Sequence, residues 1–145
     1  MRFRAFTLTC LLLLPASCKD DCDCLPDRTI LSFTLADGEF AAGSYTVELR
    51  VDGELRATCS SVFADSPQDQ VSCDDPAVEV DQGRARISAE LPEFDEGASI
   101  SVELRDEQSA AWAGSAMVEA QGYSAWTCAC WQGMAEGELA LSAGG

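Results

Sequence analysis

Apolar and polar residues alternate with a period of two along most of this 145-residue chain. Such alternation predicts half-buried antiparallel strands, because successive side chains of a strand point to opposite faces of its sheet. Turn-forming pairs such as Asp52-Gly53 and Asp75-Pro76 separate the alternating segments. The pattern predicts an all-β fold, specifically an antiparallel β-sandwich of about seven to nine short strands. The alternating segments are residues 31–35, 45–51, 55–59, 85–91, 100–104, 126–130 and 139–141.

The clearest hairpin signal is Asp52-Gly53 within SYTVELRVDGELRATCS. A two-residue loop would place Leu49 opposite Arg56, so that core and charged residues would share one face. A three-residue loop, beginning one residue earlier or ending one residue later, instead pairs Leu49 with Leu55. Because register follows the buried face, we expect the three-residue loop with a bulge, and Cys59 in the core.

The stretch GSYTVELRVDGELRATCS, residues 43–60, resembles the G-x-Y-x-V…DG hairpin of small extracellular bacterial β-sandwich domains. These domains are of immunoglobulin-like or transthyretin-like type and are common among lipoproteins of environmental, myxobacteria-like bacteria. The resemblance implies a β-sandwich in an exported lipoprotein. The class is functionally diverse, so the resemblance implies no particular activity.

The N-terminus has the layout of a secretory signal peptide. Arg2 and Arg4 precede an apolar run over residues 5–14, which is too short to span a bilayer as a helix. The following LPASC resembles a bacterial lipobox, which implies cleavage before Cys18 and acylation of its sulfur. We therefore expect a lipoprotein signal peptide over 1–17. Ordinary cleavage after Ala16 or Ser17, which would release a periplasmic or secreted protein, is the alternative.

The expected mature chain consists of lipidated Cys18 and an acidic tether over 18–28, followed by a β-sandwich domain over 29–145. An acylated cysteine would hold the domain stably at the membrane. Lys19 directly after the anchor resembles an outer-membrane sorting signal, so we expect an outer-membrane or cell-surface lipoprotein.

The number of cysteines favours the lipid anchor. Seven of the eight cysteines follow residue 17, and seven thiols leave one unpaired in an oxidising compartment. If Cys18 carries lipid, the remaining six can all pair. The candidates for disulfides are Cys22, Cys24, Cys59, Cys73, Cys128 and Cys130.

Spacing suggests how these six sulfurs pair. We expect a Cys59–Cys73 bridge, which closes a loop of about 15 residues and contributes roughly 3 kcal/mol in the chain-entropy description. The other four form two C-x-C pairs, Cys22/Cys24 and Cys128/Cys130, and residues two apart on a strand face the same side. We expect two bridges between these pairs, either 22–128 with 24–130 or the crosswise arrangement.

Two thiol-based functions are alternatives for the same four residues. A four-thiolate site could hold Zn²⁺ or Cu(I), although zinc usually uses the wider C-x₂₋₄-C spacing. A C-x-C dithiol could be a redox centre, but Asp20, Asp21 and Asp23 make the first pair electronegative, which disfavours a reactive thiolate. In an oxidising compartment we favour disulfides, with no metal and no cofactor.

Charge excludes some partners. Loss of Arg2 and Arg4 would leave seven basic against twenty-five acidic residues, a formal net charge of −18. A nucleic-acid partner is not expected, because phosphate neutralisation requires Lys and Arg in excess. The membrane, through the lipid anchor, is the expected partner, together with a protein or a glycan. The acidic clusters lack the D-x-D-x-D-G spacing of a calcium loop.

Catalytic signals are weak. The chain has no histidine, so Ser–His and Cys–His nucleophile arrangements are excluded. It also has no G-x-S-x-G, Walker or dinucleotide motif, and we expect a structural or binding protein rather than an enzyme. Exposed indoles can stack on sugar rings; Trp126 shares the face of Cys128 and Cys130, whereas Trp131 lies on the opposite face. Trp131 is therefore the candidate ligand-binding residue.

Overall fold

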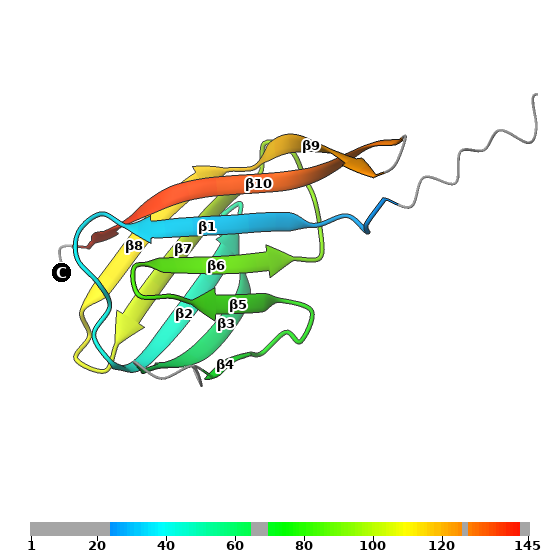
Figure 1. Ribbon diagram of the computed structural model, residues 1–145. Helices are drawn as coiled ribbons and strands as arrows, with labels where there is room; N and C mark the ends of the chain where they lie inside the picture. The colour runs from blue at the N-terminus through cyan, green and yellow to red at the C-terminus, as the bar shows by residue number, and fades with distance from the viewer. Residues whose placement is uncertain (1–23, 65–69, 126–127, 143–145) are drawn as a thin grey trace, which may run out of the picture.

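The computed structural model describes residues 24–64, 70–125 and 128–142, which consist of strands and loops (Figure 1). None of the described segments forms a helix long and apolar enough to cross a membrane. The strands in these ranges are β1 (Thr29–Leu35), β2 (Gly43–Val51), β3 (Glu54–Phe63), β4 (Gln70–Cys73), β5 (Glu79–Gln82), β6 (Arg86–Leu91), β7 (Ser99–Asp106), β8 (Ala111–Met117), β9 (Glu119–Ala125) and β10 (Cys128–Leu141).

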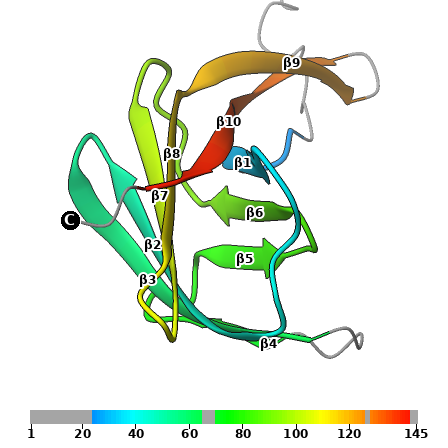
Figure 2. The same ribbon diagram turned by 90° about the vertical axis from the view of Figure 1, so that its left-hand side faces the viewer.

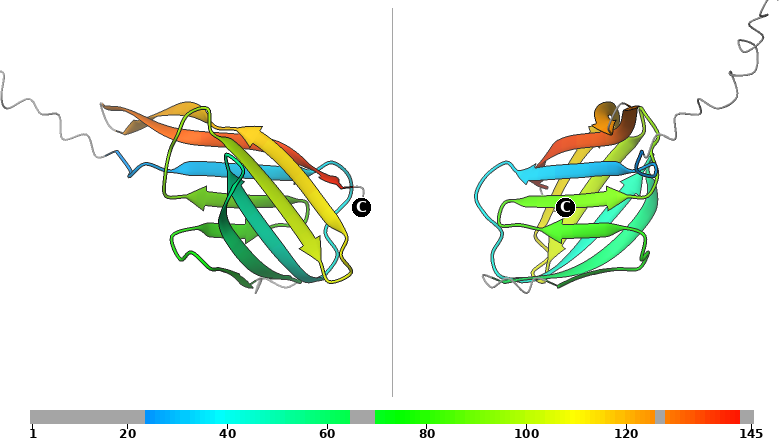
Figure 3. Two further views of the ribbon diagram at one scale, coloured as in Figure 1. Left: turned by 180° about the vertical axis from the view of Figure 1, so that it is seen from behind. Right: turned by 45° about the vertical axis from the view of Figure 1, so that its right-hand side comes forward.

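The strands form one nearly closed, barrel-like sheet. Hydrogen-bonded neighbours follow the order β4-β3-β2-β7-β8-β10-β1-β6-β5, and β9 pairs with β10 beside this path. The strands at the two ends of the order, β4 and β5, contact each other. Figures 2 and 3 show two crossed layers, with β2, β3, β7 and β8 in one and β1, β5 and β6 in the other.

The long strand β10 connects the two layers. Its central part, Gly133–Leu139, runs beside β1, and its end pairs with β8 through Ala140 and Leu141. The sequence predicted two separate segments here, 126–130 and 139–141. They were not recognised as one strand because the alternation of buried residues breaks at Gln132 and Gly133, which are consecutive and both buried.

The fold is all-β and disulfide-bonded, but its pairing differs from the expected antiparallel β-sandwich. β1 pairs with β10 in parallel, from Thr29 opposite Gly133 to Leu35 opposite Leu139. The sheet is therefore mixed, and its hydrogen bonds continue from one layer to the other. Alternation identifies strands but not their neighbours, so a parallel pair between the first and last strands leaves no signal in the sequence.

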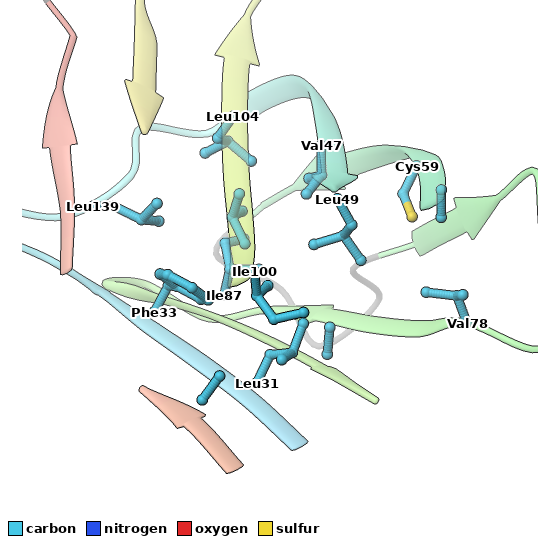
Figure 4. Packing of buried hydrophobic residues seen from close by; sticks show 14 of the residues in the cluster. Leu31, Phe33, Val47, Leu49, Cys59, Val78, Ile87, Ile100, Leu104 and Leu139 are labelled. Carbon is cyan, nitrogen blue, oxygen red and sulfur yellow. The ribbon is translucent and has the colours of Figure 1, made fainter. Parts of the chain in front are cut away.

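The core lies between the two layers. Leu31, Phe33 and Ile87 extend from one layer toward Val47 and Leu104 of the other, and each is at most 1% exposed (Figure 4). Burying a side chain of this size stabilises the fold by about 1.5–3 kcal/mol. Most alternating apolar residues of the sequence thus face one shared interior, whereas Leu55 and Leu141 are exposed.

The expected three-residue loop of the β2–β3 hairpin is wrong. Asp52 and Gly53 form a two-residue turn, with φ angles of 51° and 83°, and Val51 pairs with Glu54. A register shift beyond Leu49 leaves Arg56 as an extra residue, so Leu49 faces Ala57 rather than Leu55. The bulge restores the buried face that the turn alone would have lost. Cys59 is fully buried, as expected.

Strand β8 was not predicted because its sequence, AWAGSAM, consists mainly of small residues without alternation. Small residues are needed where β8 meets β10. A Cβ atom at Gly114 would overlap the backbone carbonyl oxygen of Glu138, and a Cβ at Gly137 would lie 2.5 Å from Cε1 of Phe33. Gly114 therefore allows β8 to approach β10 closely, and Gly137 leaves room for the ring of Phe33 on β1.

Candidate functional site

The start of the described chain is covalently joined to the hairpin formed by β9 and the first half of β10. We call the described residues Glu119–Ala125 and Cys128–Met134 the β9–β10 hairpin. Cys24 is disulfide-bonded to Cys130, with a Cα–Cα distance of 5.7 Å and a sequence separation of 106 residues. Figure 1 shows the described N-terminal segment beside the end of this hairpin, at the opposite end of the molecule from the C-terminal end of β10.

Hydrogen bonds hold the same segment along the hairpin. The backbone N–H of Leu25 donates to the hydroxyl of Tyr123 over 3.0 Å. Arg28 donates from Nε to Oε1 of Gln132 over 3.2 Å, and its carbonyl oxygen accepts from the N–H of Gly133 over 2.9 Å. The guanidinium of Arg28 also pairs with Glu90 at 3.5 Å. Residues 24–28 therefore enter β1 along a fixed path.

The second cysteine of the C-terminal C-x-C pair, Cys130, is 2% exposed, and Cys128 is disulfide-bonded as well. The 24–130 bond is the one expected for parallel rather than crosswise pairing of the two C-x-C motifs. Cys22 and the proposed lipid attachment site Cys18 lie outside the described residues, so a 22–128 bridge stays a prediction.

The third bridge joins Cys59 to Cys73, which are directly opposite each other on β3 and β4. Their Cα atoms are 3.9 Å apart, and Cys59 is fully buried. The bridge fastens the short strand β4 to the body of the sheet. Cys59 is bonded to Cys73, and Cys24 is bonded to Cys130. None of these four sulfurs is therefore a thiolate in this form of the protein.

Trp131 is the most exposed aromatic side chain of the hairpin, with 60% of its surface accessible. It pairs across the strands with Gly122, and the six-membered ring of its indole covers that glycine. A Cβ built on Gly122 would lie 3.3 Å from Cζ3 of Trp131. Packing of an aromatic ring over a glycine compensates for the missing side chain of the glycine, and here it leaves the other side of the indole open.

The other two tryptophans differ from Trp131. Trp112 on β8 is partly buried and packs edge-to-face against Phe40, with ring centroids 5.9 Å apart, and obliquely against Tyr45 at 6.2 Å. It is a packing residue. Trp126 lies outside the described residues.

The β9–β10 hairpin differs in charge from the rest of this acidic chain. No residue from 120 to 125 or from 128 to 135 carries a charged side chain. Beside it, β8, β9 and β10 enclose a hollow of about 620 Å³, lined by Met117, Met134, Glu119 and Glu136 among others. The hairpin therefore presents apolar and uncharged polar groups, with carboxylates only at its base.

An ion-pair cluster centred on Arg56 connects three segments. Arg56, the extra residue of the β3 bulge, donates to Oδ2 of Asp75 and to Oε1 of Glu93, each over 2.5 Å. The hydrogen bond to Glu93, followed by that to Asp75, raises the pKa of Arg56 above its ordinary value. The bond from Arg56 lowers the pKa of Asp75. The cluster holds the β4–β5 and β6–β7 loops against β3 and was not predicted, because its members are far apart in the sequence.

The interior also contains one polar pair. Ser61 on β3 donates its hydroxyl proton to Oε1 of Gln82 on β5 over 2.5 Å, and both residues are 1% exposed. The amide nitrogen of Gln82 is buried without a hydrogen-bond partner in the described part of the chain. The pair connects the two layers near the edge strands.

Two acidic clusters of the described chain, Asp74-Asp75 and Asp95-Glu96, lie in turns and loops. Asp74 accepts a hydrogen bond from the backbone N–H of Thr58, and Asp75 accepts from Ala77 and Arg56. Asp95 and Glu96 are exposed. Across residues 24–64, 70–125 and 128–142, no three cysteine, histidine or acidic side chains are grouped so as to hold a metal ion.

Comparison with protein-family models, curated proteins and solved structures gives no match for this chain. The resemblance of residues 43–60 to hairpins of bacterial immunoglobulin-like or transthyretin-like domains therefore stays a prediction.

Proposed function

We propose that the chain is an exported lipoprotein, anchored to the membrane through acylated Cys18, whose disulfide-bonded domain is a structural or binding module rather than an enzyme. The observation that carries the proposal is the use of the cysteines. Cys24, Cys59, Cys73, Cys128 and Cys130 are all disulfide-bonded. With Cys22 as the partner of Cys128, every cysteine after the signal peptide is paired except Cys18.

The oxidised state of these cysteines supports export, because disulfides persist in compartments outside the reducing cytoplasm. It also favours this function over the thiol-based alternatives. A thiolate metal site or a C-x-C redox centre would require Cys24 and Cys130 as free thiols, at least transiently, and Cys130 is almost fully buried.

We also propose that the domain is a sandwich of immunoglobulin-like or transthyretin-like type. Two crossed layers around a common core support it. The parallel pairing of β1 with β10 departs from a purely antiparallel sandwich, so the proposed domain is a variant in which β10 joins the two layers.

Lys19 supports an outer-membrane or cell-surface location, and the formal net charge of −18 favours a partner other than nucleic acid. Trp131 is the proposed contact residue for a protein or glycan partner, because its indole is open on one side.

Expression of the full chain in a Gram-negative host with a labelled fatty acid tests the proposal. We expect the label in the native protein and in Cys22→Ala, and a membrane location for both. Cys18→Ala should lose the label and leave the membrane fraction. Label that persists in Cys18→Ala, or an unlabelled native protein, would overturn the lipid anchor.

A further inference from the structure

We propose that the β9–β10 hairpin lies against the lipid bilayer, with the indole of Trp131 in the headgroup region. This inference rests on the proposed lipid anchor at Cys18 and adds the orientation of the domain and the surface that contacts the membrane. The hairpin surface thus contacts the same bilayer that holds the lipid anchor.

Chain length limits how far the hairpin can be from the membrane. Six peptide steps separate Cys18 from Cys24, and Cys24 is bonded to Cys130 in the hairpin. A fully extended chain covers at most about 3.3–3.6 Å per residue, so the anchor is within about 20 Å of Cys24, whose Cα is 5.7 Å from that of Cys130 in the hairpin. A 22–128 bridge would shorten the free chain to four steps, or about 14 Å. This limit keeps the hairpin end of the domain close to the membrane surface.

The absence of charged side chains from most of the β9–β10 hairpin suits contact with a bilayer. The mature chain has a formal net charge of −18, yet the hairpin residues 120–125 and 128–135 carry no charge. Moving carboxylates into a headgroup region would cost desolvation energy, whereas serine, glutamine and alanine side chains cost little. The uncharged surface is therefore located at the end of the domain that the anchor holds, whereas the carboxylates of Asp20, Asp21 and Asp23 belong to the tether between the anchor and Cys24.

The exposed apolar side chains of this end suit an interface. Trp131 is 60% exposed, and its ring packs over Gly122, so its orientation is restrained before any contact. Leu25, 50% exposed, lies at the same end of the domain, where its backbone N–H donates to the hydroxyl of Tyr123. Tryptophan is enriched at membrane interfaces because its apolar ring and polar N–H match the change in polarity there.

The test uses the full-length lipidated protein in vesicles of zwitterionic phosphatidylcholine, some of it brominated on the acyl chains near the headgroup. Bromine quenches only indoles that reach the bilayer. We expect the native protein to be quenched and Trp131→Phe to lose most of this quenching. Val62→Ser, which alters a side chain 52% exposed on β3, away from β9 in Figure 1, should be quenched like the native protein.

Quenching that is absent from the native protein, or that Trp131→Phe leaves unchanged, would overturn the orientation. Trp131→Phe alters an exposed side chain, so its fold should persist, and an unchanged thermal transition checks this. The mass of the lipidated N-terminal peptide is measured on the same sample. A protein without lipid overturns the proposed function, whereas a lipidated protein without Trp131 quenching overturns only the orientation.

Discussion

Cys24 and Cys130 are bonded to each other although 106 residues separate them, so one disulfide ties the start of the described chain to its last strand. The bond closes nearly the whole domain into a loop. Because β1 already pairs in parallel with β10, the bridge and the strand pairing fix the same two ends of the chain. The N-terminal tether therefore continues into the most constrained part of the fold.

The first prediction concerns the stability contributed by the 24–130 bridge and by the predicted 22–128 bridge, which we call the two tether bridges. A loop of about 100 residues contributes about 4.7 kcal/mol in the chain-entropy description. If Cys22 pairs with Cys128, removing only the 24–130 bridge leaves an almost identical loop closed. Cys24→Ala/Cys130→Ala should then cost much less than 4.7 kcal/mol, and the quadruple alanine variant should cost about that amount. Urea unfolding measures both.

The same experiment has a control in Cys59→Ala/Cys73→Ala, which opens an independent loop of about 15 residues and should cost roughly 3 kcal/mol on its own. Costs of the two tether bridges that simply add would contradict a 22–128 pairing, because only bridges that close the same loop are redundant.

The second prediction concerns Gly114, at the junction of β8 and β10. An alanine there would place its Cβ against the backbone carbonyl of Glu138, which cannot rotate away. We expect Gly114→Ala to lower the free energy of unfolding by about 1–3 kcal/mol. Gly83→Ala is the control, because its Cβ would be 3.6 Å from the nearest atom, and it should be nearly neutral. Thermal unfolding of both variants decides; equal melting temperatures would contradict the close approach of the two strands.

The third prediction concerns how the stability that Asp75 contributes depends on pH. The hydrogen bond from Arg56 holds the pKa of Asp75 below its ordinary value of 3.8 in the folded protein. A carboxylate with a depressed pKa stabilises the fold above its unfolded-state pKa, and this stabilisation disappears as the pH falls through the folded-state pKa. Asp75→Asn should therefore be less stable than the native protein at pH 6, and the difference should vanish in acid below the ordinary pKa.

Urea unfolding across this pH range measures the effect, with Asp37→Asn, an exposed carboxylate after β1, as the matched control. A stability difference for Asp75→Asn that is independent of pH would show that Arg56 does not depend on the charge of Asp75.

The fourth prediction compares the contributions of Trp112 and Trp131 to the stability of the domain. Trp112 packs against Phe40 and Tyr45, so Trp112→Ala should destabilise the domain by about 3–5 kcal/mol. Trp131→Ala removes a side chain that is mostly exposed and should cost much less. Thermal unfolding compares the two; a larger loss for Trp131→Ala would mean that its indole is part of the packing rather than an open surface.

Much of the sheet follows from alternation alone. The predicted segments 31–35, 45–51 and 100–104 fall within β1, β2 and β7, and 85–91 begins one residue before β6, because each has one face in the common core. Strands β8 and β9 were not predicted, because the small residues of AWAGSAM and EAQGYSA produce no alternation. In β8 the residues are small because this strand must approach β10 closely at Gly114, which is a tertiary requirement.

The turn of the β2–β3 hairpin shows where local reasoning was insufficient. Asp52-Gly53 is a strong signal for a two-residue turn, and the conflict of faces at Leu49 and Arg56 was real. The chain resolves the conflict with a bulge at Arg56 rather than with a longer loop. The reason lies elsewhere in the sequence, because the displaced Arg56 binds Asp75 and Glu93.

For the candidate site, alternation correctly placed Trp131 on the face opposite Cys130, and the two residues are 60% and 2% exposed. The contacts of the tether with Tyr123 and Gln132 were beyond prediction, because they depend on which strand lies beside β1. The parallel pairing of β1 with β10 determines that neighbour.

We propose that acylation uses Cys18, the one cysteine that the disulfides leave unpaired. Intact mass of the mature protein, extracted from membranes and alkylated with and without prior reduction, tests it most directly. We expect a chain that begins at Cys18 and carries the mass of its acyl groups. It should take up no alkylating reagent before reduction and six equivalents after reduction. An unacylated chain, or one with thiols that react before reduction, would contradict it.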